Sequence, residues 1–399
     1  MSSSGNTLKI SVPEGIRWDR ELQKSLHEAL PYYVPNFVDA NFDAKAVTVQ
    51  SRKPLVDPSA TEDMIAKLMK DLSRSFRDVA EVTLISHQAE GAMAEQDPFP
   101  ILAERGEVVS TGHGKFVYRG DFNRVFEGLD SVLRAMCVSH GATPETYPST
   151  VMTQSLLESG YLKLHPHLAF LAAPVKASSE SLKAVSQINL ADIDSAPDVV
   201  QLLGMPDQVL APTVCYHTFE SRRGQLTEAS RITALNKCHR HEPVNVKSLS
   251  RLTTYWMREI VAFGEDQELQ ELLDATLDWT IDLLKRLDMS FEVVSANDPF
   301  FATEGAGNRM MQSAFMLKRE VKIPVSNGQT IAVASFNHHQ GSLCSKFTMS
   351  PKEETEKGLS SCCVGWGFER LLYAIYSRHG ADLAAWPQHV RNALALDAS

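Results

Sequence analysis

Two kinds of hydrophobic pattern alternate along the chain and predict its elements. Helical spacing of apolar residues predicts helices at 19–30, 64–72, 122–136 and 266–287. Two-residue alternation predicts strands near 8–12, 47–49 and 82–84, and over 232–240, 253–263, 290–296, 315–325 and 330–338. Asn327-Gly328, between the last two strands, is typical of a tight hairpin turn. Many hairpins with few helical crossovers favour an antiparallel sheet, so the pattern predicts an α+β fold.

The same pattern divides the chain into three parts. Residues 1–87 predict a small α+β module, and residues 88–115, which contain Pro98, Pro100 and several glycines, are typical of a linker. The larger domain is expected over residues 116–399. A chain of 399 residues exceeds one ordinary domain, which agrees with this division.

Composition narrows the class of protein. The net charge of −10, from 39 basic and 49 acidic residues, argues against a surface devoted to nucleic acid, although a local basic patch stays open. The first residues lack the pattern of a signal peptide, and no apolar run approaches the roughly 18 residues of a membrane span. We therefore expect a soluble, cytoplasmic protein without a membrane partner. Six cysteines in so long a chain favour burial or metal binding over a disulfide framework.

Two arginine-containing segments indicate the chemistry. Arg240 lies in Cys238-His239-Arg240-His241-Glu242, at the end of a predicted strand. Arg370 follows the glycine-containing run Gly365-Trp366-Gly367-Phe368-Glu369 and would enter the first turn of a helix, where free N–H groups favour phosphate. Two arginines from separate elements could grip a bent triphosphate and leave its α-phosphorus open to a carboxylate. The two segments therefore predict ATP binding and acyl-adenylate formation.

These segments resemble motifs 2 and 3 of the class II aminoacyl-tRNA synthetases. The closer resemblance is to the amino acid:[carrier protein] ligases, truncated homologues of the methanogenic-type seryl-tRNA synthetases. It extends through Leu164–Leu168, Val214–His217, Arg251–Gly264, Ala296–Phe301 and Ser335–Gln340, covering about residues 120–385. It implies a class II synthetase-like antiparallel sheet flanked by helices, and it leaves the first 115 residues outside.

Carried over by position, the resemblance implies five roles in binding ATP. Arg240 would hold the α-phosphate and the substrate carboxylate, and Arg370 the γ-phosphate, with Arg251 assisting. Glu242 would accept from the adenine amino group. Tyr255 matches the aromatic position on which adenine stacks, although an ordinary packed aromatic remains an alternative.

The resemblance also implies a zinc site formed by Cys215, Glu259 and Cys363. Three protein ligands leave a fourth position, which would take the α-amino group of the substrate. Without the resemblance, both cysteines would be interpreted as small buried hydrophobic residues. Cys362 would lie on the other face of its strand, because successive strand residues point opposite ways.

The same strand rule applies to His338 and His339, which cannot readily share one ion and are interpreted as polar lining near the nucleotide. Ser335 and Asn337 are candidate ligands for Mg²⁺, since the acidic ligand of many synthetases would fall at Ala332. Two segments depart from the family pattern. Gly341–Cys344 replaces an acidic, histidine and aromatic run, and Thr303–Asn308 replaces a more basic turn and bears on which amino acid fits.

The resemblance implies a two-step reaction. A small amino acid, glycine or alanine, would attack ATP to give an aminoacyl adenylate, and the phosphopantetheine thiol of a carrier protein would then take the aminoacyl group. A homodimer through the helix at 122–136 is expected, although that apolar stripe could simply be core, as is usual for an amphipathic helix.

Two rival functions stay open. A seryl-tRNA synthetase could use residues 1–115 as a tRNA-binding arm, but these residues are not strongly basic, so tRNA is disfavoured. A silent paralogue would bind an amino acid without turnover. For the N-terminal module, docking a carrier, covering the active site and dimerising are all open.

Overall fold

A computed structural model describes most of the chain. The described residues are 6–16, 18–75, 81–188, 199–242, 246, 248–296, 317–326, 328–352 and 358–397. Three sequence interpretations lie outside them: the run from Asn297 to Phe301, the turn from Thr303 to Asn308, and Asn327 of the hairpin dipeptide.

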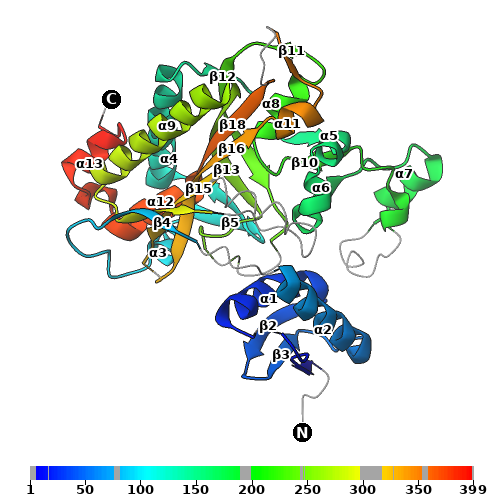
Figure 1. The fold of residues 1–399 in the computed structure, drawn as a ribbon. Coiled ribbons are helices and arrows are strands. Elements are labelled where there is room, and N and C mark those ends of the chain that lie inside the picture. Colours follow the sequence, from blue (N-terminus) through cyan, green and yellow to red (C-terminus); the bar gives the residue numbers. More distant parts are fainter. Residues whose placement is uncertain are drawn as a thin grey trace.

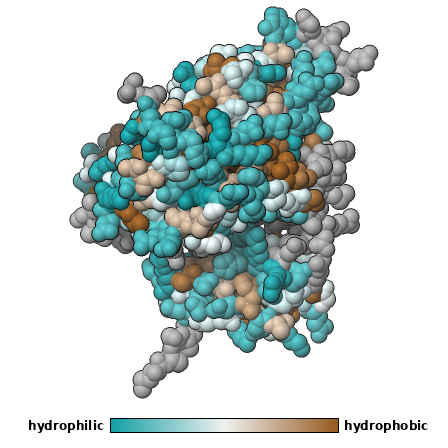
Figure 2. All heavy atoms as spheres, turned by 90° about the vertical axis from the view of Figure 1, so that its left-hand side faces the viewer, coloured by the Kyte–Doolittle hydropathy of each residue, from teal (hydrophilic) through white to brown (hydrophobic). Residues whose placement is uncertain are grey.

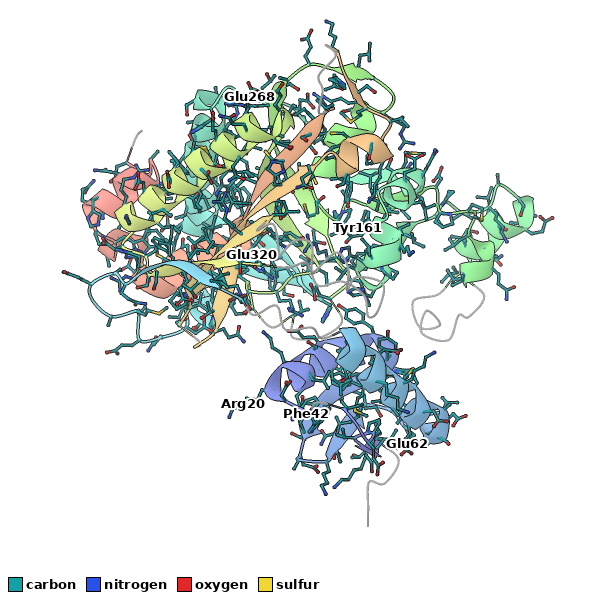
Figure 3. All side chains as sticks on the ribbon, in the orientation of Figure 1. Arg20, Phe42, Glu62, Tyr161, Glu268 and Glu320 are labelled. Carbon is teal, nitrogen blue, oxygen red and sulfur yellow. The ribbon has the colours of Figure 1, made fainter. Side chains whose placement is uncertain are left out.

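The first part of the chain forms a separate module at the base of the molecule (Figure 1). Its elements are β1 (Thr7–Ser11), α1 (Arg20–Tyr33), β2 (Phe37–Phe42), β3 (Ala46–Ser51) and α2 (Pro58–Ser75). The strands form an antiparallel sheet in the order β1-β3-β2, and both helices pack on it. The predicted stripe of Leu22, Leu26 and Leu30 is buried against this sheet, and Asp19 caps α1 by accepting from the Leu22 N–H. Figure 3 marks the module by Arg20 and Phe42.

The larger part is built on an eight-stranded sheet in the order β4-β14-β15-β16-β18-β13-β12-β7. All neighbours are antiparallel except β7, which runs parallel to β12. The strands are β4 (Thr83–His87), β7 (Thr143–Pro144), β12 (Ser230–His239), β13 (Thr254–Gly264), β14 (Phe291–Ser295), β15 (Lys318–Pro324), β16 (Thr330–Gln340) and β18 (Ser360–Gly367). The predicted α+β fold with an antiparallel sheet is confirmed.

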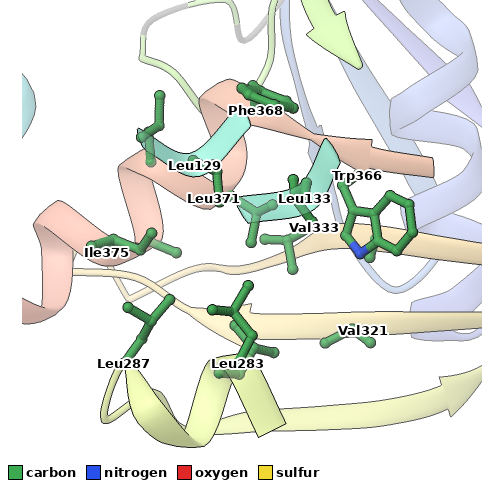
Figure 4. Packing of buried hydrophobic residues seen from close by; sticks show 14 of the residues in the cluster. Leu129, Leu133, Leu283, Leu287, Val321, Val333, Trp366, Phe368, Leu371 and Ile375 are labelled. Atoms are coloured by element: carbon green, nitrogen blue, oxygen red, sulfur yellow. The ribbon is translucent and has the colours of Figure 1, made fainter. Parts of the chain in front are cut away.

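Helices cover one face of this sheet and form the main core (Figure 4). They are α4 (Gly120–Ser139), α9 (Asp266–Arg286) and α12 (Phe368–His379). The stripe predicted over 122–136 is core, because Leu129 and Leu133 of α4 are fully buried against the sheet. Alternation along each strand sends the remaining side chains to the opposite face, beside α8 (Cys215–Ser221) and α11 (Ser342–Lys346). That opposite face holds the candidate site.

Two element assignments differ from expectation. The strand predicted near residues 82–84 was placed in the module, but β4 pairs with β14 at the edge of the large sheet. Residues 88–115 were interpreted as a linker, but they contain α3 (Pro98–Glu104) and β5 (Val108–Gly112), which pairs with β6 (Lys115–Tyr118). Leu102 and Val108 are buried in the main core. These elements are too short to show periodicity, although Asp97 before Pro98 is a helix-start signal.

Short elements extend from the sheet beside α8. They are β8 (Thr150–Met152), α5 (Thr153–Glu158), α6 (Tyr161–Leu164), η1 (Pro166–Leu168), β9 (Leu171–Ala172), α7 (Ser179–Ser186), η3 (Val199–Leu202), β10 (Gln208–Leu210), β11 (Leu226–Thr227) and β17 (Ser350–Pro351). The chain ends with η5 (Leu383–Ala385) and α13 (Gln388–Ala393).

The surface in Figure 2 is mainly hydrophilic, with apolar residues in scattered groups. Among the described helices, none combines the length and the apolar character needed to cross a bilayer. All six cysteines are buried and none forms a disulfide, which agrees with the expectation from their number.

Candidate active site

Strand register brings together side chains that are far apart in sequence. Glu259 of β13 pairs opposite Gly365 of β18, and Cys363 lies two residues along β18, on the same face as Gly365. Cys363 in turn pairs opposite Asn337 of β16. A Cβ built on Gly365 would lie 3.4 Å from Glu259 Cγ and 2.5 Å from Met257 Cε. The glycine therefore leaves room for the Glu259 side chain to extend over β18.

The helix α8 adds a cysteine to this face. Cys215 is its first residue, and the preceding Val214 N–H donates to Glu259 Oε1 at 3.0 Å, which fixes the start of the helix against β13. The Sγ atoms of Cys215 and Cys363 and a carboxylate oxygen of Glu259 all lie within 4.8 Å of one another, and all three residues are buried. The three residues predicted as metal ligands are thus brought together.

The donor set of this cluster fits zinc. Glu259 Oε2 is buried and has no hydrogen-bond partner among the described residues, and burial raises the pKa of this carboxyl group. The pKa of the Cys215 thiol is raised well above its usual value by its hydrogen bond to Cys363 and by burial. Unpaired buried polar atoms cost free energy, and a divalent cation would satisfy this oxygen and both sulfurs. Two thiolates and a carboxylate suit zinc better than magnesium.

Further side chains of β16 contact the Cys363 sulfur. Asn337 Nδ2 lies 3.5 Å and His339 Nε2 lies 3.4 Å from Cys363 Sγ, and His339 Nδ1 lies 3.2 Å from Ser361 Oγ. His338 points the other way, towards the backbone oxygen of Asp266 at the start of α9. The two histidines therefore diverge as predicted. The interpretation of both as nucleotide lining is wrong for His338, which faces α9, and it missed that His339 contacts a candidate metal ligand.

Cys362 also behaves as the strand rule predicted. Its sulfur faces the helix-covered side of the sheet, 3.9 Å from the backbone oxygen of Leu269. Ser335, the other candidate for Mg²⁺, shares the face of Asn337 and accepts from Asn337 Nδ2 at 3.3 Å. Both of those residues therefore face the site, while their role towards Mg²⁺ stays a prediction.

Arg240 lies directly beyond the end of β12. Its Nε donates to the Pro212 oxygen at 3.3 Å, and its guanidinium carbon lies 5.8 Å from the centre of the Tyr255 ring. The contact has cation–π geometry, so in this structure Tyr255 supports Arg240. Stacking of adenine on Tyr255 stays a prediction.

Two further arginines converge on the same region. Arg251 forms an ion pair with Glu242 at 3.2 Å. Arg370, in the first turn of α12, donates to the Ser250 oxygen at 2.8 Å and to the Ala332 oxygen at 3.1 Å. The pKa of Arg370 is lowered, first by burial and further by the charges of Arg251 and Arg240. Three guanidinium groups that repel one another are suited to bind a polyanion.

Glu369 is a buried residue of this region that the sequence analysis did not assign. Its carboxyl group accepts from the Trp256 N–H at 2.9 Å and from the Tyr118 hydroxyl at 2.9 Å, which ties α12 to β13 and β6. Burial raises the pKa of Glu369 to about 7. The sequence did carry one signal for Glu369, namely a charged residue directly after the apolar Phe368 at the start of a buried helix.

Known proteins resemble the chain in sequence. It is 29% identical over 279 residues to amino acid--[acyl-carrier-protein] ligase 1 of Bradyrhizobium diazoefficiens, covering 68% of this chain and 83% of that protein. It is 28% identical to ligase 2 of the same organism, covering 66% of this chain and 78% of that protein. The type-2 serine--tRNA ligase of Methanopyrus kandleri is 24% identical over 70% of this chain and 56% of its own length. No family model matches the chain.

Solved structures resemble the chain in fold. The seryl-tRNA synthetase of M. kandleri, solved in complex with A. aeolicus tRNASec, has a TM-score of 0.70 at 20% identity, covering 95% of this chain and 76% of that one. The seryl-tRNA synthetase from Pyrococcus horikoshii, complexed with ATP, has a TM-score of 0.60 at 12% identity, covering 86% and 83%. The chain therefore has the class II aminoacyl-tRNA synthetase fold and resembles the amino acid--[acyl-carrier-protein] ligases, as its motifs predicted.

Proposed function

We propose that the protein activates a small amino acid, glycine or alanine, as an aminoacyl adenylate and transfers it to the phosphopantetheine thiol of a carrier protein. The observation that carries the proposal is the cluster of Cys215, Glu259 and Cys363 close to Arg240, whose charge acts on Glu259 and, together with Arg251, on Arg370. The names of the similar ligases support the same reaction class.

In the first step, the chain supplies position and positive charge. Arg240 would neutralise the α-phosphate and orient the substrate carboxylate for attack on phosphorus. Arg370 and Arg251 would bind the outgoing pyrophosphate, in exchange for their present contacts with Ala332 and Glu242. Mg²⁺ would rest mainly on the phosphates, with Ser335 and Asn337 as candidate protein ligands.

Cys215, Glu259 and Cys363 would hold the zinc ion. When bound, zinc supplies an open coordination position for an uncharged α-amino group. The three ligands come from two strands and a helix start, so they define where that amine lies relative to Arg240. An acid without an amine would lack this anchor, which would restrict the substrates to amino acids.

In the second step, a carrier thiol would attack the aminoacyl carbonyl and release AMP. Orientation of that thiol at the sheet face is the chain's expected contribution. A homodimer is a further part of the proposal, testable by sedimentation of the full chain.

A pyrophosphate-exchange screen across the amino acids tests the proposal. We expect exchange with glycine or alanine that a zinc chelator abolishes, followed by aminoacylation of a holo carrier protein. If the folded, zinc-loaded protein showed no pyrophosphate exchange with any amino acid, the proposal would be wrong.

A second candidate function is aminoacylation of tRNA. One observation favours it, namely that the M. kandleri synthetase fold covers 95% of this chain, which includes most of the N-terminal module. The screen distinguishes the two functions when the activated chain is offered holo carrier protein and tRNA separately. Transfer to tRNA alone would make the second candidate correct.

A further inference from the structure

The N-terminal module contacts the candidate ATP site through Tyr32 of α1. The Tyr32 hydroxyl donates to the backbone oxygen of His241 at 3.3 Å. Its ring meets His167 edge to face, with the ring centres 4.7 Å apart. The module lies below this part of the catalytic domain in Figure 1, with α1 on its upper side.

The point of contact is the segment that leaves β12. His241 stands between Arg240 and Glu242, two residues proposed to bind ATP. Its N–H donates to the Leu168 oxygen at 2.9 Å, and its ring packs edge to face on Phe170 with centres 5.5 Å apart. Tyr32 adds a contact to the carbonyl group of the same residue.

The surroundings of Tyr32 keep its hydroxyl a donor. Burial raises the pKa of Tyr32 far above its ordinary value, and the neighbouring charge of Glu242 raises it further. The hydroxyl therefore remains protonated at any pH at which the protein works, and the carbonyl group of His241 can only accept.

We infer that Tyr32 is a positioning residue of the ATP site: it fixes the carbonyl of His241, and with it the direction in which Arg240 and Glu242 leave the sheet. The inference gives the module a role in catalysis and rests on the proposed function. Because both the N–H and the carbonyl group of His241 are hydrogen-bonded, the backbone from which the Arg240 and Glu242 side chains extend is fixed. Removing the neutral hydrogen bond from Tyr32 would loosen this backbone and weaken ATP binding about 2- to 10-fold.

The chain offers a matched control at the next position. Tyr33 is also a tyrosine of α1, but it packs against the module's own core. Tyr33→Phe therefore removes a hydroxyl from the same helix without changing the contact to His241.

The experiment compares full-length wild type with Tyr32→Phe, Tyr32→Ala and Tyr33→Phe, after thermal unfolding has shown that each variant is folded. Hydrogen exchange of the peptide containing His241 reports the backbone contact, and equilibrium dialysis with ATP reports its consequence. We expect both Tyr32 variants to speed exchange at His241 and raise the Kd for ATP about 2- to 10-fold, with unchanged zinc content. Tyr33→Phe should match wild type.

Two results would overturn the inference. One is exchange at His241 that is the same in the Tyr32 variants as in Tyr33→Phe. The other is faster exchange with an unchanged Kd, which would leave Tyr32 a structural role alone. Failure of the wild type to bind ATP would instead contradict the proposed function, and exchange at His241 would still decide whether Tyr32 holds this segment.

Discussion

The candidate site has two sides that are built differently. The sulfur side consists of Cys215, Glu259 and Cys363, and the cationic side consists of Arg240, Arg251 and Arg370. On the sulfur side, Cys363 and Glu259 project from paired strands. The Oε2 atom of Glu259 accepts no hydrogen bond from the described residues. On the cationic side, Arg251 and Arg370 are already paired, with Glu242 and with backbone oxygens. The sulfur side therefore offers a ligand an unpaired carboxylate oxygen, whereas the arginines of the cationic side must exchange their present contacts for a ligand.

This difference predicts how each side responds to change. The metal cluster should respond in an all-or-nothing way, because losing one of its three ligands leaves two that cannot hold a tetrahedral ion. Loss of one of the three arginines should give a graded loss, because several charges share one polyanion.

Removing a ligand of the sulfur side should have the largest effect. We expect Cys215→Ala and Glu259→Gln to lose stoichiometric zinc and to lower amino-acid-dependent pyrophosphate exchange by about 10³-fold, because the amine loses its anchor. ATP binding should survive, since the arginines are untouched. Metal analysis and exchange assays check this, with Cys362→Ala as the control on the opposite face. Full zinc content in Cys215→Ala would refute the assignment.

On the cationic side, Arg240→Ala should lower kcat/KM for exchange by about 10²- to 10³-fold, the usual loss when one charge on a developing oxyanion is removed. Zinc content should stay at the wild-type level. Arg240→Lys should recover only part of the rate, because an ammonium group cannot form the paired hydrogen bonds of a guanidinium. If Arg240→Ala lost zinc as well, the two sides would be one unit and the comparison would fail.

The contacts behind the sulfur side allow a finer test. His339→Ala removes a group 3.4 Å from the Cys363 sulfur, so we expect zinc affinity to fall about 10- to 100-fold in competition with a chelator. His338→Ala is the matched control, because that neighbouring ring faces α9. Equal losses in both variants would assign the effect to β16 in general and not to the sulfur contact.

Glu369, next to Arg370, should make the free energy of unfolding depend on pH. The pKa of this carboxyl group is about 7 in the folded chain, against 4.5 ordinarily, so the folded state binds the proton more tightly than the unfolded state. The contribution of Glu369 to the free energy of unfolding is therefore complete below pH 4.5. It is lost as the pH rises towards 7, by up to about 3 kcal/mol.

Glu369→Gln should remove this dependence. Urea unfolding of the wild type and of Glu369→Gln between pH 5 and 8 measures the difference between their free energies of unfolding. Glu271→Gln, on the exposed surface of α9, is the control. Parallel profiles for wild type and Glu369→Gln would show that the carboxyl group titrates normally.

Long periodic elements were predictable from the sequence, since the helix expected over 266–287 is α9 at Asp266–Arg286. Short elements were not, because α3 and β5 bury their apolar residues through long-range packing that no local period reports. The placement of β4 failed for a related reason, since strand pairing depends on distant partners.

The candidate site divides in the same way. Arg240 and Arg370 were recognisable from their local segments. The grouping of Cys215, Glu259 and Cys363 followed from the resemblance alone, because it depends on the register of β13 and β18 and on the start of α8. The contacts of His339 to Cys363 and of Tyr32 to His241 had no local signal, because each joins residues that are distant in the sequence.

Cobalt in place of zinc would show whether the cluster of Cys215, Glu259 and Cys363 binds the amine, since Co²⁺ bound to thiolates absorbs visible light and reports its ligands. The full chain loaded with one equivalent of Co²⁺ should show thiolate absorption, which Cys363→Ser weakens. Glycine or alanine should shift that spectrum, whereas acetate, which has no amine, should leave it unchanged. A spectrum without thiolate character, or one that acetate shifts as much as glycine does, would contradict the claim that this cluster selects an amino acid by its amine.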